Sequence, residues 1–161
     1  MSSLVAWTGH RPDIFLDGAA ARAIVETEAR TQRAAGAGGF LVGGQRGVDT
    51  WAAQAAISLA VPFSVVLPGD PEEFARDWAE ADRKALLDTL TQAVAVRVVG
   101  GYSLRNRLLA TESQLLVVVW TGTRGGGTAE TIDLARKAGT PLREILLEPS
   151  SSAGSLRGRG I

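Results

Sequence analysis

The chain has 161 residues, enough for one folded domain with a sizeable hydrophobic core. Hydrophobic residues make up 45% of the chain and charged residues 21%, proportions that are ordinary for a folded protein and exclude a disordered one. Lysine plus arginine and aspartate plus glutamate number 17 each, so the formal net charge is zero and no overall basic field attracts duplex DNA or an anionic membrane. The absence of cysteine excludes disulfides, thiolate metal sites and cysteine nucleophiles, and the single histidine, His10, excludes a poly-histidine metal site within one chain.

The apolar runs of the chain are short. Residues 4–7 lack the length and the basic leader of a secretory signal, and residues 115–120 fall far short of the roughly 20 residues of a membrane-spanning helix. We therefore expect a cytoplasmic protein without a membrane partner.

Short apolar runs alternate with alanine-rich stretches of helical composition along the chain. Expected strands occupy residues 4–7, 40–42, 63–67, 94–99, 115–120 and 142–147. Expected helices occupy residues 18–35, 48–60, 71–91 with a break, 104–112 and 128–138. The alternation predicts an α/β fold that is Rossmann-like and doubly wound, with a mainly parallel sheet of about six or seven strands and helices on both faces. Ligands of such sheets bind beyond the carboxyl ends of the strands, near the point where the strand order reverses.

A single domain is expected over residues 1–148. Within it, the acidic residues 70–88 predict a solvated helical insertion that is anchored by Trp78. Residues 149–161 consist mainly of glycine, serine and arginine, a composition that predicts a disordered tail.

The loop after the first strand offers polar side chains beside a tight turn. Gly9 permits a close approach of the backbone, and His10 and Arg11 follow it at the position where a polar ligand binds in this architecture. The alternative is an ordinary turn with a solvated histidine, and the sequence weighs the two equally.

Paired glycines precede the second helix and predict an anion site. Backbone N–H groups at a helix start are free to bind phosphate, and the helix dipole adds positive potential. Arg46 can supply a fork of donors, and Asp49 either contributes to the site or only caps the helix. The candidate ligand-binding residues of this loop are Gly43, Gly44, Gln45, Arg46, Gly47 and Asp49.

Two later loops also contain glycines directly before a helix. Ser103 is the expected N-cap after the fourth strand, and an arginine in the turn that follows is favourable when an anion binds beside it. Three consecutive glycines after the fifth strand have no packing value, so we expect their backbone to cradle a phosphate. Glu130 is either an acid that complements the helix dipole or a ligand to ribose hydroxyls. The candidates of these two loops are Arg105, Asn106, Gly125, Gly126, Gly127, Thr128 and Glu130, with Arg124 as a further phosphate ligand.

Other chemistries fit the sequence less well. The glycine loops lack the Gly-Lys-Ser/Thr ending of a Walker motif, which disfavours ordinary ATP hydrolysis. A Ser–His–Asp triad would have to use His10, and no nucleophile-elbow pattern surrounds any serine. Trp51 and Trp78 are expected in core or lid positions, with base stacking on a tryptophan as the alternative.

These motifs, in this order, resemble those of the SLOG superfamily, and most closely its YpsA-like and YspA-like branches. The motifs are Thr-Gly-His10-Arg-Pro, Gly-Gly-Gln-Arg-Gly-Val-Asp49, the Trp78 segment, Arg105-Asn106-Arg107 and Gly-Gly-Gly-Thr128, and they span roughly residues 4–147. The superfamily also includes the Lonely Guy phosphoribohydrolases, the molybdenum-cofactor carrier proteins and the Rossmann domain of DprA. The resemblance implies a Rossmann-like domain that binds a nucleotide or a nucleotide-derived ligand, as a sensor or carrier, and that forms a homodimer or homotetramer.

Two alternative functions stay open. Lonely Guy enzymes carry Pro-Gly-Gly-x-Gly-Thr-x-x-Glu with a catalytic glutamate, and alignment of Gly127-Thr128 with that Gly-Thr places Thr131 at the glutamate. An N-glycosidic hydrolase of nucleoside 5′-monophosphates would therefore use Glu130 or Asp49 to orient a water molecule, although Glu130 lies about 100° around the helix from the family position. A DprA-like module for single-stranded DNA is the second alternative, and the neutral charge disfavours a nucleic-acid partner. No metal or cofactor is expected, apart from Mg²⁺ that arrives with the phosphates of a nucleotide.

Overall fold

Six strands form one sheet in the order β4-β3-β2-β1-β5-β6 in the computed structural model, which describes residues 3–151. Every neighbouring pair of strands is parallel. The strand order reverses between β1 and β5, and this is where the ligand crevice of a doubly wound sheet opens. The strands are β1 (Ser3–Gly9), β2 (Ala37–Val42), β3 (Phe63–Leu67), β4 (Ala95–Val98), β5 (Leu115–Trp120) and β6 (Leu142–Leu146).

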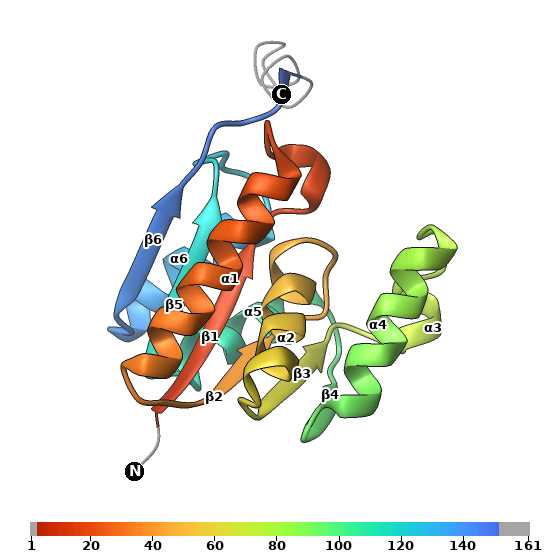
Figure 1. The fold of residues 1–161 in the computed structure, drawn as a ribbon, viewed down its shortest axis with the longest axis horizontal. Coiled ribbons are helices and arrows are strands. Elements are labelled where there is room, and N and C mark those ends of the chain that lie inside the picture. The colour runs from red at the N-terminus through yellow and green to blue at the C-terminus, as the bar shows by residue number, and fades with distance from the viewer. Residues whose placement is uncertain (1–2, 152–161) are drawn as a thin grey trace.

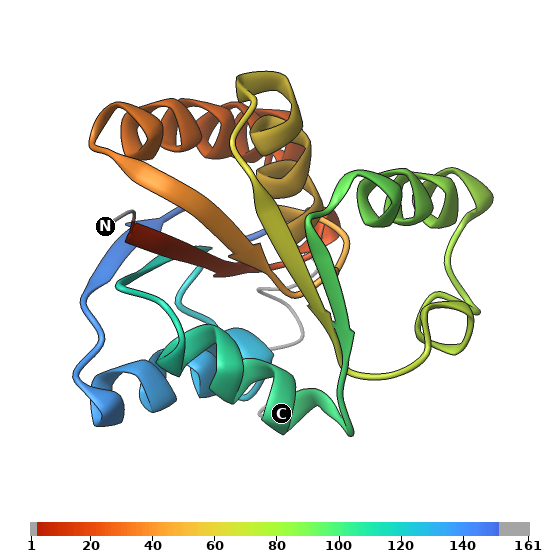
Figure 2. The ribbon, with the colours of Figure 1, turned by 90° about the horizontal axis from the view of Figure 1, so that it is seen from below.

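Helices cover both faces of this sheet. Figure 2 shows α1 (Gly18–Ala34) and α2 (Val48–Leu59) on one face, and α5 (Tyr102–Thr111) and α6 (Gly127–Ala138) on the other. The predicted Rossmann-like α/β fold is thereby confirmed, with six strands. The remaining elements are η1 (Pro12–Ile14), between β1 and α1, and the helices α3 (Pro71–Phe74) and α4 (Glu80–Gln92), between β3 and β4 (Figure 1).

Two hydrophobic layers hold the helices on the sheet, and β5 contributes to both. Val117 and Val119 pack in the layer that includes α1 and α2, whereas Leu116, Val118 and Trp120 pack in the layer that includes α5 and α6. Because both faces of the strand are covered, its sequence is a continuous apolar run without alternation.

The insertion between β3 and β4 has the predicted break. Its two helices are separated by residues 75–79, and Trp78 is buried in that connection. The Trp78 ring lies edge-on to Phe74, with the ring centroids 5.0 Å apart. Trp78 therefore anchors α3 beside the first residues of α4, as the sequence predicts.

After β6 the chain returns to the connection between β1 and α1. An antiparallel bridge joins Phe15 to Pro149. Leu16 N–H donates to Glu148 O, and Ser150 N–H donates to Ile14 O, both at 2.9 Å (Figure 1). The tail predicted over residues 149–161 thus begins with paired backbone, and its part from residue 152 lies outside the described residues. No helix within residues 3–151 has the length and apolar character needed to cross a bilayer.

Candidate functional site

A cavity of about 480 Å³ lies at the carboxyl ends of β1 and β5, where the strand order reverses. The loops after these two strands and the beginnings of α2, α5 and α6 form its walls. Of the predicted site residues, those that border the cavity are Gly9, His10, Arg11, Gln45, Asp49, Arg105, Asn106, Gly125, Gly126, Gly127 and Thr128. Gly43, Gly44, Arg46 and Gly47 belong to the loop before α2 without bordering the cavity, and Glu130 borders a neighbouring hollow of about 730 Å³.

The start of α6 presents free backbone donors at this cavity. Gly126 is the N-cap, no side chain caps the helix, and the N–H of Glu130 is the one that donates to Gly126 O, at 3.1 Å. The N–H groups of residues 127–129 therefore have no acceptor within the helix. A Cβ atom on Gly125 or Gly126 would meet no atom within 4 Å, so this loop borders open space.

The start of α2 is different, because other protein groups occupy its donors and its space. Val48 N–H donates to His10 O and Thr50 N–H donates to Gln45 O, both at 3.2 Å. Gly47 has a φ of 86°, and a Cβ atom there would collide with the His10 carbonyl oxygen. This glycine serves a close approach of two backbone segments, and a phosphate would find fewer free donors here than at α6.

A buried hydrogen-bond network joins three of the predicted loops. Arg105 donates from Nη1 to Gly43 O at 2.6 Å and from Nε to Asn106 Oδ1 at 2.7 Å. Asn106 Nδ2 donates to Glu130 Oε1 at 2.8 Å, and Ser103 Oγ donates to Glu130 Oε2 at 3.0 Å. The network fixes the loop after β2 against α5 and α6, and it commits both carboxylate oxygens of Glu130 to α5.

Ser103 does not cap α5, and that expectation was wrong. The helix begins at Tyr102, with Gly101 as its N-cap. Ser103 lies inside the first turn, where its hydroxyl bonds Glu130 of α6 rather than the backbone of its own helix.

Several residues of the cavity wall were not selected from the sequence. Tyr102 borders the cavity because the helix starts two residues earlier than expected. The signal that could have found this residue is its place directly after a Gly-Gly pair at the end of a strand. The other members of the wall that were not selected are Thr8, Ile14 and Thr123.

Asp49 is a buried carboxylate with one unused oxygen. Its Oδ2 accepts from Gln45 N–H at 3.1 Å, so Asp49 bonds the loop before α2 and not the first turn of the helix. Its Oδ1 is buried and has no partner. Burial raises the pKa of Asp49 to about 6, and the positive charge of Arg105 limits the rise. Asp49 borders the cavity, whereas its Oδ1 atom has almost no surface open to it.

His10 is a neutral histidine in the cavity wall. Its Nε2 lies 3.1 Å from Thr121 Oγ1, and its ring centroid is 5.7 Å from that of Phe15 and 6.1 Å from that of Trp120. Burial lowers the pKa of His10 to about 4, and the charge of Arg11 acts in the same direction. At pH 7 the ring therefore offers a hydrogen bond rather than a positive charge.

The arginines expected at a phosphate have different surroundings. Arg46 lies with its Cζ 5.0 Å from the centroid of the Trp78 ring, and its Nε is buried without a partner. Arg124 borders the cavity, is half-exposed, and donates from Nη2 to Asp133 Oδ2 at 2.7 Å. A ligand in the cavity can reach Arg124, whereas Arg46 stacks on the insertion.

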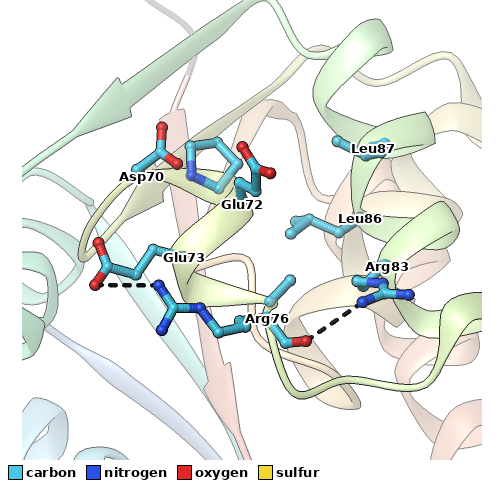
Figure 3. A pocket seen from close by; sticks show the side chains of 9 residues that line it. Asp70, Glu72, Glu73, Arg76, Arg83, Leu86 and Leu87 are labelled. Carbon is cyan, nitrogen blue, oxygen red and sulfur yellow. Dashed lines mark hydrogen bonds and ion pairs between the residues drawn. The ribbon is translucent and has the colours of Figure 1, made fainter.

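A further hollow, of about 800 Å³, lies away from this cavity, between α3 and α4 (Figure 3). None of the predicted site residues lines it. Its two arginines are engaged, since Arg76 pairs with Glu73 at 3.8 Å and Arg83 Nη1 donates to the backbone oxygen of Arg76 at 3.3 Å. The side chains of Arg76 and Glu73 are 70% and 73% exposed, so water screens their charges and the hollow holds no built polar site.

The described residues 3–151 contain no cluster of three or more histidine, aspartate or glutamate side chains that could hold a metal ion. A metal ion at the cavity would thus need ligands from the bound molecule as well as from the protein.

Solved structures share the fold of this chain. No family model matches the sequence, and no curated protein matches it. One structure of the molybdenum cofactor carrier protein from Chlamydomonas reinhardtii is 23% identical, over 97% of this chain and 82% of that one, with a TM-score of 0.64. A second structure of that protein is 21% identical, over 89% and 76% of the two chains, with a TM-score of 0.63.

DNA processing protein A (DprA) from Streptococcus pneumoniae has the same fold. It is 18% identical over 99% of this chain and 57% of its own, with a TM-score of 0.65. The carrier protein and DprA represent two groups that the resemblance to the SLOG superfamily names, so that resemblance is confirmed at the level of the fold.

Proposed function

We propose that the protein binds a nucleotide or a nucleotide-derived ligand, as a sensor or carrier, in the cavity between β1 and β5. The observation that carries the proposal is the uncapped N-terminus of α6, beside glycines that border open space in a cavity of about 480 Å³. Free N–H groups and the helix dipole suit a phosphate, and a cavity of this size suits a small molecule. The fold shared with a molybdenum cofactor carrier protein supports the role of a carrier.

The polar groups around the cavity match the two ends of a nucleotide. Arg11 and Arg124 add positive charge near the glycine loop, where the phosphate would bind. The buried Oδ1 of Asp49 lacks a hydrogen-bond donor, and a ligand whose binding opens access to this oxygen would supply one from ribose hydroxyls or from an amino group of a base. An inorganic anion alone would satisfy the first requirement and not the second.

The proposal is tested by substitution at the N-cap of α6. Gly126 has a φ of −121° and free space around it, so larger residues fit there without strain. We expect Gly126→Asp to keep its thermal stability, because aspartate is a favourable N-cap, and to bind AMP at least tenfold more weakly in titration calorimetry, because its charge repels the phosphate.

Gly126→Asn is the matched control, since asparagine has the size and capping ability of aspartate without the charge. Wild-type AMP affinity in both the Asp and the Asn variant would place the phosphate elsewhere, because either side chain also occupies backbone donors of the α6 N-terminus. A wild-type protein that binds no nucleotide would overturn the proposed function itself.

Hydrolysis of a nucleoside 5′-monophosphate is the second candidate function, and Asp49 favours it. The carboxylate is buried beside the cavity, has one oxygen without a partner and has a pKa of about 6, which suits a group that orients water or transfers a proton. Glu130 is less suited, since both of its oxygens bond α5. Chromatography of the same AMP samples separates the two functions: adenine and ribose 5-phosphate indicate a hydrolase, and intact AMP indicates a binding protein.

A further inference from the structure

The aromatic side chains of the chain are buried, except for the partly buried Phe74 and the exposed Tyr102. The sequence has four tryptophans, four phenylalanines and one tyrosine, all within residues 3–151. The tryptophans are at most 9% exposed, which removes the stacking role that the sequence left open for one of them. Tyr102 is 55% exposed and borders the candidate cavity. An aromatic surface available to a ligand is therefore found at Tyr102 among the described residues.

The Tyr102 ring is supported by its neighbours. Phe74 of α3 lies next to it, with ring centroids 6.2 Å apart, and Phe74 in turn packs edge-on against the buried Trp78. Arg105 lies with its Cζ 5.4 Å from the centroid of the Tyr102 ring. Hydrogen bonds to Gly43 O and Asn106 Oδ1 fix that guanidinium. The ring thus rests on a cation and an aromatic cluster and still exposes more than half of its side chain.

Tyr102 shares the cavity with the phosphate loop proposed above. The wall that contains Tyr102 also contains residues 124–128, so one small molecule can touch both. A nucleotide has a phosphate at one end and a flat aromatic base at the other, and bases of any kind stack on aromatic side chains. A sugar phosphate has the first group and lacks the second.

We propose that Tyr102 is the platform on which the base of the ligand stacks, so that the cavity selects nucleotides over sugar phosphates. This inference rests on the proposed function, because it takes the phosphate to lie on the start of α6. It adds the class of ligand and the residue that selects it. Tyr102→Phe keeps the stacking surface, and Tyr102→Ala removes it.

The test compares AMP with ribose 5-phosphate by titration calorimetry in four proteins: the wild type, Tyr102→Ala, Tyr102→Phe and Leu104→Ala. Leu104 is a matched control, since it is 44% exposed on the same helix and does not border the cavity. We expect Tyr102→Ala to bind AMP about tenfold more weakly or worse, and ribose 5-phosphate with unchanged affinity. The Phe and Leu104 variants should bind AMP like the wild type. In the wild type, the adenine H2 and H8 NMR signals should shift upfield on binding, and in Tyr102→Ala they should not.

The outcomes separate this inference from the proposed function. If the wild type binds AMP and ribose 5-phosphate equally well, or if Tyr102→Ala binds AMP like the wild type, the phosphate site stands and the stacking role is rejected. If Tyr102→Ala weakens both ligands equally, Tyr102 supports the site without contacting the base, and the inference also fails. If the wild type binds neither ligand, the proposed function and this inference fail together.

Discussion

Burial acts in opposite directions on Asp49 and His10, two of the titratable side chains that border the cavity. It raises the pKa of Asp49 to about 6 and lowers that of His10 to about 4, because each environment disfavours the charged form. The folded state therefore holds the Asp49 proton more tightly than the unfolded chain, and it holds the His10 proton less tightly. With rising pH, Asp49 lowers the free energy of unfolding and His10 raises it.

Asp49→Asn should reveal the contribution of the aspartate. Between about pH 4 and pH 6 the folded wild type retains a proton that the unfolded chain loses, so its free energy of unfolding declines relative to that of the variant. We expect the variant to be about as stable as the wild type near pH 4, and more stable by about 3 kcal/mol above pH 6. Urea unfolding followed by tryptophan fluorescence across this range measures the difference. A difference that does not change with pH would contradict the buried, proton-binding carboxylate.

At the scale of the elements, glycines before two helices have two different purposes. The glycine loop before α2 is packed, with Gly47 against the backbone after β1, whereas the loop before α6 borders open space. The first loop positions the walls of the cavity, and the second leaves its backbone available to a ligand.

Alanine substitution distinguishes these two kinds of glycine. Gly47→Ala combines a left-handed φ of 86° with a collision against His10 O, so we expect it to lower the free energy of unfolding by about 2 kcal/mol or more. Gly126→Ala has neither problem, and because alanine is a poorer N-cap than glycine we expect it to lower the free energy of unfolding by about 1 kcal/mol or less. Thermal unfolding of the two variants provides the measurement, and equal destabilisation would mean that the α6 loop is packed as well.

The bounds of a strand could be predicted where both of its faces are buried, because such a strand is an apolar run in the sequence. The bounds of β3 and β5 agree with the expected residues 63–67 and 115–120, because β5 is an uninterrupted apolar run and β3 is apolar except for Ser64. The beginning of β2 at Ala37 was missed, since the glycines that follow pair through their backbone with β1 and have no side chains to form a pattern. The start of α5 was misplaced because a hydrogen bond to another helix decides the role of Ser103.

The sequence predicted where on the sheet the candidate site lies, but not the contacts of its individual residues. Parallel strands bring their carboxyl ends to one edge, so polar loops from β1, β2, β4 and β5 had to converge there. Which glycines border open space, and which are packed, depends on neighbours that are distant in sequence. The same holds for Tyr102, whose exposure depends on the insertion, and for Glu130, whose oxygens are taken by α5.

At the scale of the whole molecule, the cavity is bounded by both halves of the chain. Its wall combines residues that follow β1 with residues that follow β5, and the buried Arg105 joins the loop after β2 to α5 through Gly43 and Asn106. A ligand that touches both regions links elements from opposite ends of the sequence, so its binding free energy adds to the stability of the entire fold.

The bridge between Phe15 and Pro149 attaches the segment after β6 to the segment after β1, which forms one wall of this cavity. Without the bridge, Ile14 O and Leu16 N–H would lose their hydrogen bonds while His10 keeps its contact with α2, so we expect a smaller fraction of molecules to be ready to bind at any moment. Apparent affinity falls in proportion to that fraction. A chain that ends after Leu147 should therefore bind AMP several-fold more weakly than one that ends after Ser151, which keeps both backbone hydrogen bonds. Calorimetry on this pair of truncated chains makes the comparison, and equal affinities would show that the wall holds its shape unaided. If the shorter chain binds AMP more weakly, a segment that does not contact the ligand sets part of the entropic cost of binding.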